Sequence, residues 1–161
     1  MCSSGDERAP AVLRDYLLRV NLPSRRGMTP RQSIEQECAL RGRPEVVAGC
    51  MELLAGRETD AELIIALGGP PARGVGTGEA SWPDYWLRVW AARGLLWAWD
   101  DTALASVEAA LEDESWRVRE MALKVVARHQ LSDVVVKVAA LQEDPVPRVR
   151  AAAERALVRM R

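Results

Sequence analysis

A four-residue segment of the chain recurs 31 positions later, and this repeat constrains the fold more than any other feature. Residues 116–119 read WRVR and residues 147–150 read PRVR. The correspondence extends outward, since Asp113 matches Asp144 at the same spacing. A fixed period of this length is typical of arrays of helical repeats. Such arrays bind partners along an extended surface and seldom carry out chemistry themselves.

Hydrophobic spacing predicts helices along most of the chain. Apolar residues recur every three to four positions, and proline, glycine and capping residues mark the ends of each segment. The valine run at 134–136 is the one candidate strand, but its place in the repeat favours a helix. We expect helices over 11–20, 30–40, 44–55, 60–68, 84–99, 102–111, 116–129, 134–141 and 147–161.

The pattern divides the chain into a tail and one domain. Residues 1–28 are expected to form a flexible N-terminal tail with a short helix, and residues 29–161 a single repeat domain. The domain is interrupted at 69–83, where four glycines and three prolines gather. That composition does not hold a helix, so we expect an irregular loop there.

Composition excludes several classes of protein. The 161 residues carry 22 basic and 23 acidic side chains, a net charge of −1, whereas dedicated nucleic-acid binders usually show a basic excess. Three cysteines without C-x-x-C spacing and a single histidine predict neither a disulfide framework nor a metal site, and no cofactor is expected. No apolar run approaches a membrane span. These features favour a soluble, cytoplasmic protein.

The repeated residues resemble those of the HEAT-like (armadillo-type) helical repeat family. The shared pattern is an aspartate in a short turn, a proline or aromatic residue, R-V-R, and then small apolar residues at helical spacing. A weaker third copy aligns residues 87–88 with 118–119. The match covers residues 84–161, while 29–68 matches only as paired helices. The resemblance implies an all-α fold, a right-handed α-solenoid of antiparallel helix pairs without a sheet, in a family of mostly scaffolds and adaptors.

Most of the repeated residues have a structural interpretation. The valine anchors the first helix of each repeat to its neighbour, and the alanines permit close helix packing. Arg119 and Arg150 are expected to pair with acidic groups of the adjacent turn, such as Asp113 and Asp144. Together with Arg88, the equivalent residue of the weaker copy, they would form a ladder along the stack.

The segment 84–99 departs from the repeat. It is apolar at positions that are charged one period later, as at Trp86, Val89 and Trp97. One interpretation is a partner-binding surface around residues 82–99, to which Arg73 and Arg93 add polar contacts. The other is that the 69–83 loop and the earlier helices cover this face. The charged residues that lie one period after Trp86, Val89 and Trp97 are Arg117, Glu120 and Arg128.

The sequence is consistent with two functions. The first is a non-enzymatic module that binds a protein partner through this aromatic and arginine surface. The alternative is a nucleic-acid-binding protein resembling the HEAT-like alkylpurine DNA glycosylases. Those enzymes use aromatic residues and an acidic residue, and the only cluster in this sequence that could imitate such a site is Trp97, Trp99, Asp100 and Asp101. The last helix is not followed by a partner helix, so a homodimer through this open repeat is a further expectation.

Overall fold

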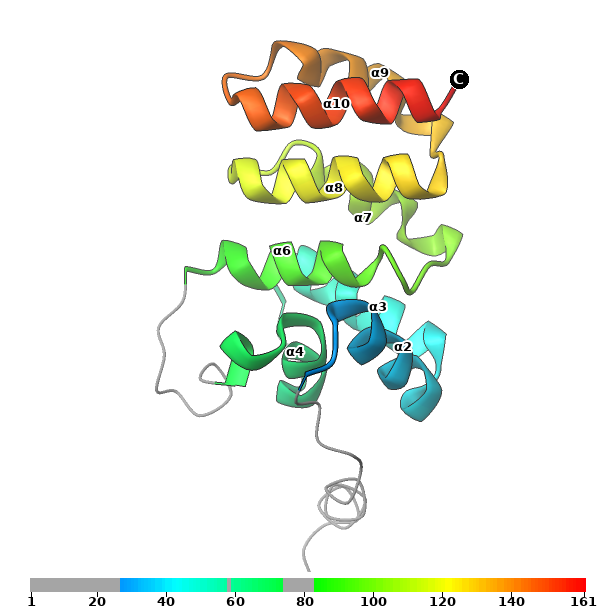
Figure 1. The fold of residues 1–161 in the computed structure, drawn as a ribbon, viewed down its shortest axis with the longest axis vertical. Helices are drawn as coiled ribbons and strands as arrows, with labels where there is room; N and C mark the ends of the chain where they lie inside the picture. The colour runs from blue at the N-terminus through cyan, green and yellow to red at the C-terminus, as the bar shows by residue number, and fades with distance from the viewer. Residues whose placement is uncertain (1–26, 58, 74–82) are drawn as a thin grey trace, which may run out of the picture.

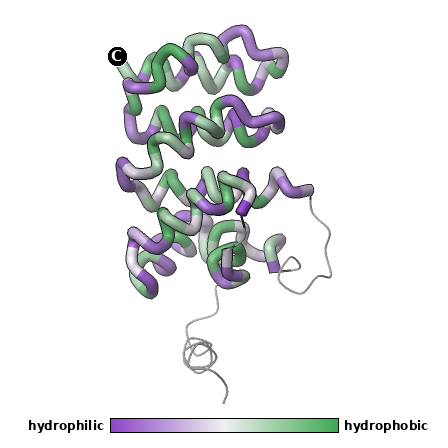
Figure 2. Tube along the Cα trace, turned by 180° about the vertical axis from the view of Figure 1, so that it is seen from behind, coloured by the Kyte–Doolittle hydropathy of each residue, from purple (hydrophilic) through white to green (hydrophobic). Residues whose placement is uncertain are grey.

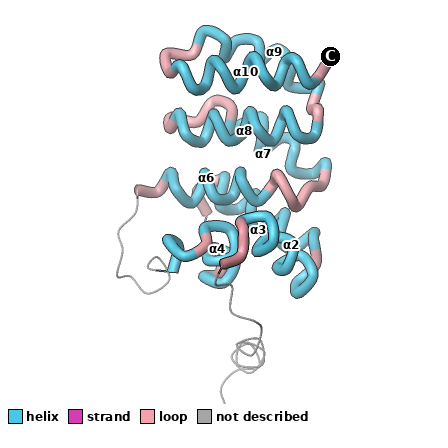
Figure 3. Tube along the Cα trace, viewed as in Figure 1, coloured by secondary structure: helices cyan, strands magenta, loops and turns pink. Residues whose placement is uncertain are grey.

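The computed structural model describes residues 27–57, 59–73 and 83–161, and within these ranges it contains helices, turns and loops but no strand (Figure 3). The predicted helix at 11–20 and most of the 69–83 loop lie outside the described residues. The elements are α2 (Pro30–Arg41), α3 (Arg43–Leu54), α4 (Ala61–Gly68), η1 (Pro70–Ala72), α6 (Tyr85–Gly94), η2 (Asp101–Ala103), α7 (Leu104–Ala110), α8 (Trp116–His129), η3 (Ser132–Val134), α9 (Val135–Ala140), η4 (Leu141–Glu143) and α10 (Pro147–Arg159).

The helices stack in one direction along the molecule. In Figure 1, α6, α8 and α10 lie side by side as one layer, while α7 and α9 lie behind them. The helix α8 contacts α6 on one side and α10 on the other, and α3 and α4 pack against α6 at the other end of the stack. The architecture is an all-α solenoid of helix pairs, which confirms the predicted fold class.

Local sequence explains where the first helices begin. Thr29 caps α2, since its hydroxyl accepts a hydrogen bond from the Gln32 amide while the Gln32 side chain accepts one from the Thr29 amide. Asp60 caps α4 by accepting from the Leu63 amide at 2.9 Å. These reciprocal and single caps satisfy amides that have no partner within the helix.

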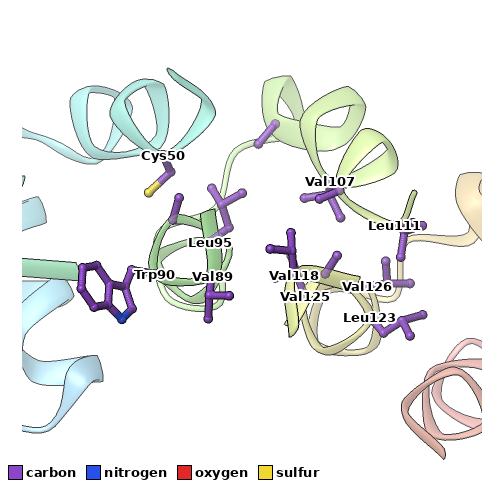
Figure 4. Close-up of a cluster of buried hydrophobic side chains, with 14 of the residues drawn as sticks. Cys50, Val89, Trp90, Leu95, Val107, Leu111, Val118, Leu123, Val125 and Val126 are labelled. Atoms are coloured by element: carbon purple, nitrogen blue, oxygen red, sulfur yellow. The ribbon is translucent and has the colours of Figure 1, made fainter. Parts of the chain in front are cut away.

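The repeated apolar residues form a continuous core between the layers. Val118, Val149, Ala122 and Ala153 are all 0% exposed, so each echoed position is buried in its own repeat. Figure 4 shows Val107 of α7, Val118 and Val126 of α8 and Leu95 from the turn after α6 in the space between these elements. Viewed from behind, apolar and polar stretches alternate along each helix, as expected for helices that bury one side (Figure 2).

The predicted helix 84–99 is too long at both ends, since α6 spans Tyr85–Gly94. Beyond Gly94 the backbone tightens, and the Trp97 amide donates to the Gly94 carbonyl at 3.1 Å. Gly94 also allows a close approach: a Cβ there would lie 2.5 Å from Leu67 Cδ2 and 2.7 Å from Cys50 Sγ. The apolar pattern continues past the helix because residues 95–98 pack into the core as a turn. The expected helices 102–111 and 134–141 likewise divide into short 3-10 and α segments.

Ion pairs join each repeat to the next. Arg88 donates to both carboxylate oxygens of Asp113, at 2.7 and 3.2 Å, and Arg119 donates to both oxygens of Asp144, at 2.8 and 3.1 Å. Asp144 is nearly sealed from solvent, with its side chain 4% exposed. We call these two pairs the Arg–Asp ladder. Its bidentate geometry makes each pair stronger and more directional than a single contact.

The ladder differs from the predicted pairing by one repeat. Arg119 reaches forward to the Asp144 carboxylate, whereas its contact with its own turn is a hydrogen bond of 2.8 Å to the Asp113 carbonyl. Arg150 makes the equivalent contact with the Asp144 carbonyl, at 2.7 Å. An arginine side chain is long enough to span one inter-repeat step, and each aspartate also accepts from an amide of its own turn. Each arginine therefore fixes a turn, and Arg119 fixes two.

Replacing Asp144 tests the energetic weight of the ladder. Asp144→Asn leaves the Arg119 guanidinium, which is 14% exposed, without its carboxylate. We expect the free energy of unfolding to fall by about 3 kcal/mol in urea denaturation, because breaking a buried pair strands a charge. Glu114→Gln is the control: this side chain is 89% exposed, so its effect should stay within about 0.5 kcal/mol. Equal effects of the two variants would show that the ladder adds little.

The same variant has a distinctive pH dependence. Burial alone would raise the pKa of Asp144, but hydrogen bonds from Arg119 and the Val146 amide lower the pKa below its ordinary value. A carboxylate with a lowered pKa stabilises the fold above its unfolded pKa of about 4, and that contribution is lost as pH falls through the folded pKa. The difference between wild type and Asp144→Asn in urea denaturation should therefore narrow as pH falls below about 4. A constant difference would contradict this assignment.

Candidate binding surface

Three positions carry basic residues at the same place in consecutive repeats. Each residue on α8 has its equivalent on α10 exactly one 31-residue period later in the chain. The three positions follow each other at helical spacing, so they lie along one side of each helix. We call this set the basic stripe. Its members are Arg117, Lys124 and Arg128 on α8 and Arg148, Arg155 and Arg159 on α10.

The basic stripe is open to solvent and locally cationic. The side chains of Arg148 and Lys124 are 67% and 42% exposed. The carboxylate within the stripe is that of Glu120, which is 11% exposed and pairs with both Lys124 and Arg148 at 3.3 Å. Six cations around one paired carboxylate leave a positive surface, although the whole chain has a net charge of −1. The overall charge therefore conceals a local patch.

Aromatic rings border the stripe where α6 meets α8. The Arg117 guanidinium stacks over Trp116 at 4.4 Å from the ring centroid, and over Tyr85 and Trp86 at 5.6 and 5.8 Å. Arg148 stacks over the same Trp116 ring at 5.4 Å. Rings and guanidinium groups thus alternate from α6 through α8 to α10. Such contacts orient the arginine side chains while leaving hydrogen-bonding edges available.

The structure separates the five predicted partner-binding residues. Val89 is 6% exposed and packs in the core, so its side chain offers almost no surface to a partner (Figure 4). Trp86 of α6 and Trp97 in the turn after α6 are half-buried and occupy the positions equivalent to Arg117 and Arg128. Arg93 turns toward α4 and lines a cleft with Arg73 rather than joining the open surface.

Trp97 is held between two cations from distant parts of the chain. The Arg128 guanidinium lies 4.6 Å from its ring centroid, and Arg31 of α2 lies 5.3 Å away. Arg128 also donates to the Leu96 carbonyl at 3.1 Å. These contacts tie α2, the turn after α6 and α8 together, so Trp97 has a structural role at the α6 end of the stripe.

The residues considered for a glycosylase-like site are engaged in local structure. Asp100 caps η2 by accepting from the Thr102 amide at 2.9 Å, and hydrogen bonds from the Thr102 side chain and amide lower the pKa of Asp100. Asp101 accepts from the Trp99 indole at 3.1 Å, and the Trp99 ring stacks on His129 at 4.5 Å. The His129 Nε2 in turn lies 2.8 Å from the Leu95 carbonyl. These residues therefore stabilise the turn between two paired helices.

The basic stripe could have been predicted from the sequence, because its residues recur in the last two copies of the repeat. Trp116 and Arg148 are site residues that sequence reasoning left out, because it looked for positions where the copies differ. The stripe consists of positions where the last two copies agree in charge, which a comparison at the 31-residue spacing would have shown. The aromatic border required the structure, since Tyr85 and Trp116 come from different repeats.

The described residues hold no group of three or more His, Cys, Asp or Glu side chains that could bind a metal ion. Among them there is also no helix with the length and apolar character needed to cross a membrane.

The family follows from a comparison with known protein families. A HEAT-repeat family model matches residues 80–158, which contain α6 to α10 and the ladder. The chain belongs to the HEAT-like repeat family. HEAT repeats commonly act as protein-interaction scaffolds, which agrees with the extended surface described above. Neither curated proteins nor solved structures gave a match to this HEAT-repeat chain.

Removing Arg117 tests the stacked border of the HEAT-repeat surface. Arg117→Ala removes one guanidinium from three aromatic rings, so we expect a loss of roughly 1 kcal/mol in unfolding free energy and stronger acrylamide quenching of tryptophan fluorescence. Arg155→Ala is the matched control, because it removes the same charge from the equivalent face without a ring contact among the described residues. Identical quenching in the two variants would contradict the stacked arrangement.

Proposed function

We propose that this HEAT-repeat protein is a non-enzymatic protein-binding module that holds an acidic partner on the basic stripe. The observation that carries the proposal is the density of cations at equivalent positions of two repeats, with Glu120 already paired. A partner that places carboxylates at matching intervals would find a charge at each repeat. Complementary charge of this kind accelerates association and excludes wrongly charged partners.

The aromatic border adds affinity to the charge. Tryptophan and arginine are the side chains most often found as interface hot spots, and Trp116, Arg117 and Arg148 lie together here. Because Arg117 and Arg148 are already stacked on a ring, they lose less conformational freedom when they pair with a carboxylate. The border would therefore anchor a partner that the stripe attracts.

Nucleic acid is the second candidate, since phosphates would also match the exposed cations of the stripe. Two observations favour a protein partner over nucleic acid. The net charge of −1 opposes nonspecific attraction of a polyanion, and the Asp100 carboxylate is already engaged in capping η2. Binding of a protein partner and binding of nucleic acid respond differently to nuclease treatment and to salt.

A charge-reversal experiment tests the function. The paired variant Arg117→Glu/Arg148→Glu should retain its circular dichroism spectrum but lose at least tenfold of the partner captured by the wild type from a nuclease-treated lysate. Arg57→Glu is the control, because Arg57 is 63% exposed, follows the end of α3 and lies outside the stripe. Unchanged capture by the paired variant would reject the stripe as the binding surface.

A nucleic-acid partner has a different signature in the same experiment. Capture would disappear after nuclease treatment, and the purified protein would bind a short DNA duplex at low salt with an affinity that falls steeply as salt rises. A homodimer through the C-terminal repeat and a cytoplasmic location stay predictions.

A further inference from the structure

A cleft of about 230 Å³ lies outside the basic stripe, between the start of α2 and the end of α4. The last turn of α6 forms one wall, and the short η1 segment forms its rim. The walls are mainly apolar, whereas the charged groups are two guanidinium groups. The residues that matter here are Met28, Pro30, Ile65, Pro70, Arg73 and Arg93.

Arg93 is a half-buried cation that pairs with no carboxylate among the residues that the structure describes. Its Nη2 donates to the Leu67 carbonyl, while its Nε is sealed from solvent and has no acceptor. None of the described acidic residues lies within ion-pair distance of Arg93, whereas Arg41, Arg88 and Arg119, which are also partly buried, each pair with at least one. Burial lowers the pKa of Arg93. Keeping such a charge unpaired costs free energy that an anion in the cleft would recover.

A capping role explains only part of this arrangement. The Leu67 carbonyl is in the last turn of α4, where a cation is favoured, and one N–H group suffices for it. The equivalent positions in the next repeats are Lys124 and Arg155, which lie on the open stripe. Only on α6 does the packing of α4 and η1 enclose this side chain, and its guanidinium keeps N–H groups that the capping role does not use.

The donors in the cleft favour one class of anion. Pro70 and Pro71 have no N–H group, and the Gly69 amide already donates to the Ile65 carbonyl at 2.8 Å. The phosphate sites of helix N-termini use several free main-chain amides, which this rim does not offer. A carboxylate carries less charge to desolvate, and its planar edge fits one guanidinium group with two parallel hydrogen bonds. The apolar walls would accommodate the rest of such a molecule.

We propose that this cleft is a binding site for a carboxylate attached to a small apolar group, held by Arg93 at the inner wall and Arg73 at the rim. The carboxylate belongs either to a free organic acid or to the C-terminal residue of a peptide, and both present the same chemistry to Arg93. The site is separate from the basic stripe, so its test does not depend on the proposed function.

Titration of the full chain with matched probes tests the site. Benzoate represents a free organic acid, and N-acetyl-leucine represents the C-terminal residue of a peptide. N-acetyl-leucinamide has the same apolar side chain without the negative charge. We expect saturable binding of at least one carboxylate by calorimetry and by chemical-shift changes, no binding of the amide, and weaker binding of inorganic phosphate. Tighter binding of benzoate than of N-acetyl-leucine would identify a free acid as the source, and the reverse order a peptide end.

Two variants assign the binding to Arg93. Arg93→Met should weaken carboxylate binding at least tenfold, whereas Arg57→Met, which removes an exposed arginine paired with Glu52, should leave it unchanged. If Arg93→Met does not fold, Arg93→Lys should still weaken binding, because it keeps the charge but loses the planar pair of donors. Absence of saturable binding in the wild type, equal binding of the amide or of phosphate, or unchanged binding in a folded Arg93 variant would each overturn the proposal.

Discussion

The bidentate ion pairs of the Arg–Asp ladder set the geometry on which the rest of this molecule depends. Arg119 joins the Asp144 carboxylate to the carbonyl groups of its own turn, so it fixes the turn before α8 relative to the turn before α10. Val118 and Val149 are buried at the same level of the stack. Because polar and apolar contacts repeat in one register, the helices α8 and α10 present equivalent surfaces to solvent, and the basic stripe follows from that equivalence.

The sequence was sufficient for the fold where the period is strict. α8 was predicted from Trp116 to His129 and has these bounds in the structure, where its apolar side runs along the helix and Gln130 in the left-handed conformation ends it. The segment after Gly94 was mistaken for helix, since residues buried in a turn can keep the spacing of residues buried in a helix. Spacing reports which residues are buried, whereas the hydrogen bonds that end α6 depend on its close contact with Leu67 and Cys50.

The candidate sites were less accessible to sequence reasoning because they depend on what covers each helix. Trp86, Arg93 and Trp97 occupy the α6 counterparts of the stripe, yet the earlier helices enclose Arg93 and α2 reaches Trp97 through Arg31. Similar positions therefore produce an open cationic surface on α8 and α10 and an enclosed guanidinium on α6. Departures from a repeat indicated where to look, but burial determined which residues remained available.

The forward direction of the ladder also makes the repeat a modular unit. Each complete unit contributes an aspartate to the repeat before it and an arginine to the repeat after it, and both residues recur at the same spacing as the buried valine. An inserted copy of 31 residues would keep every donor opposite an acceptor, whereas an insertion of another length would displace the carboxylate from the guanidinium. Selection on these ion pairs thus favours changes in the number of whole repeats over changes in the length of any one of them.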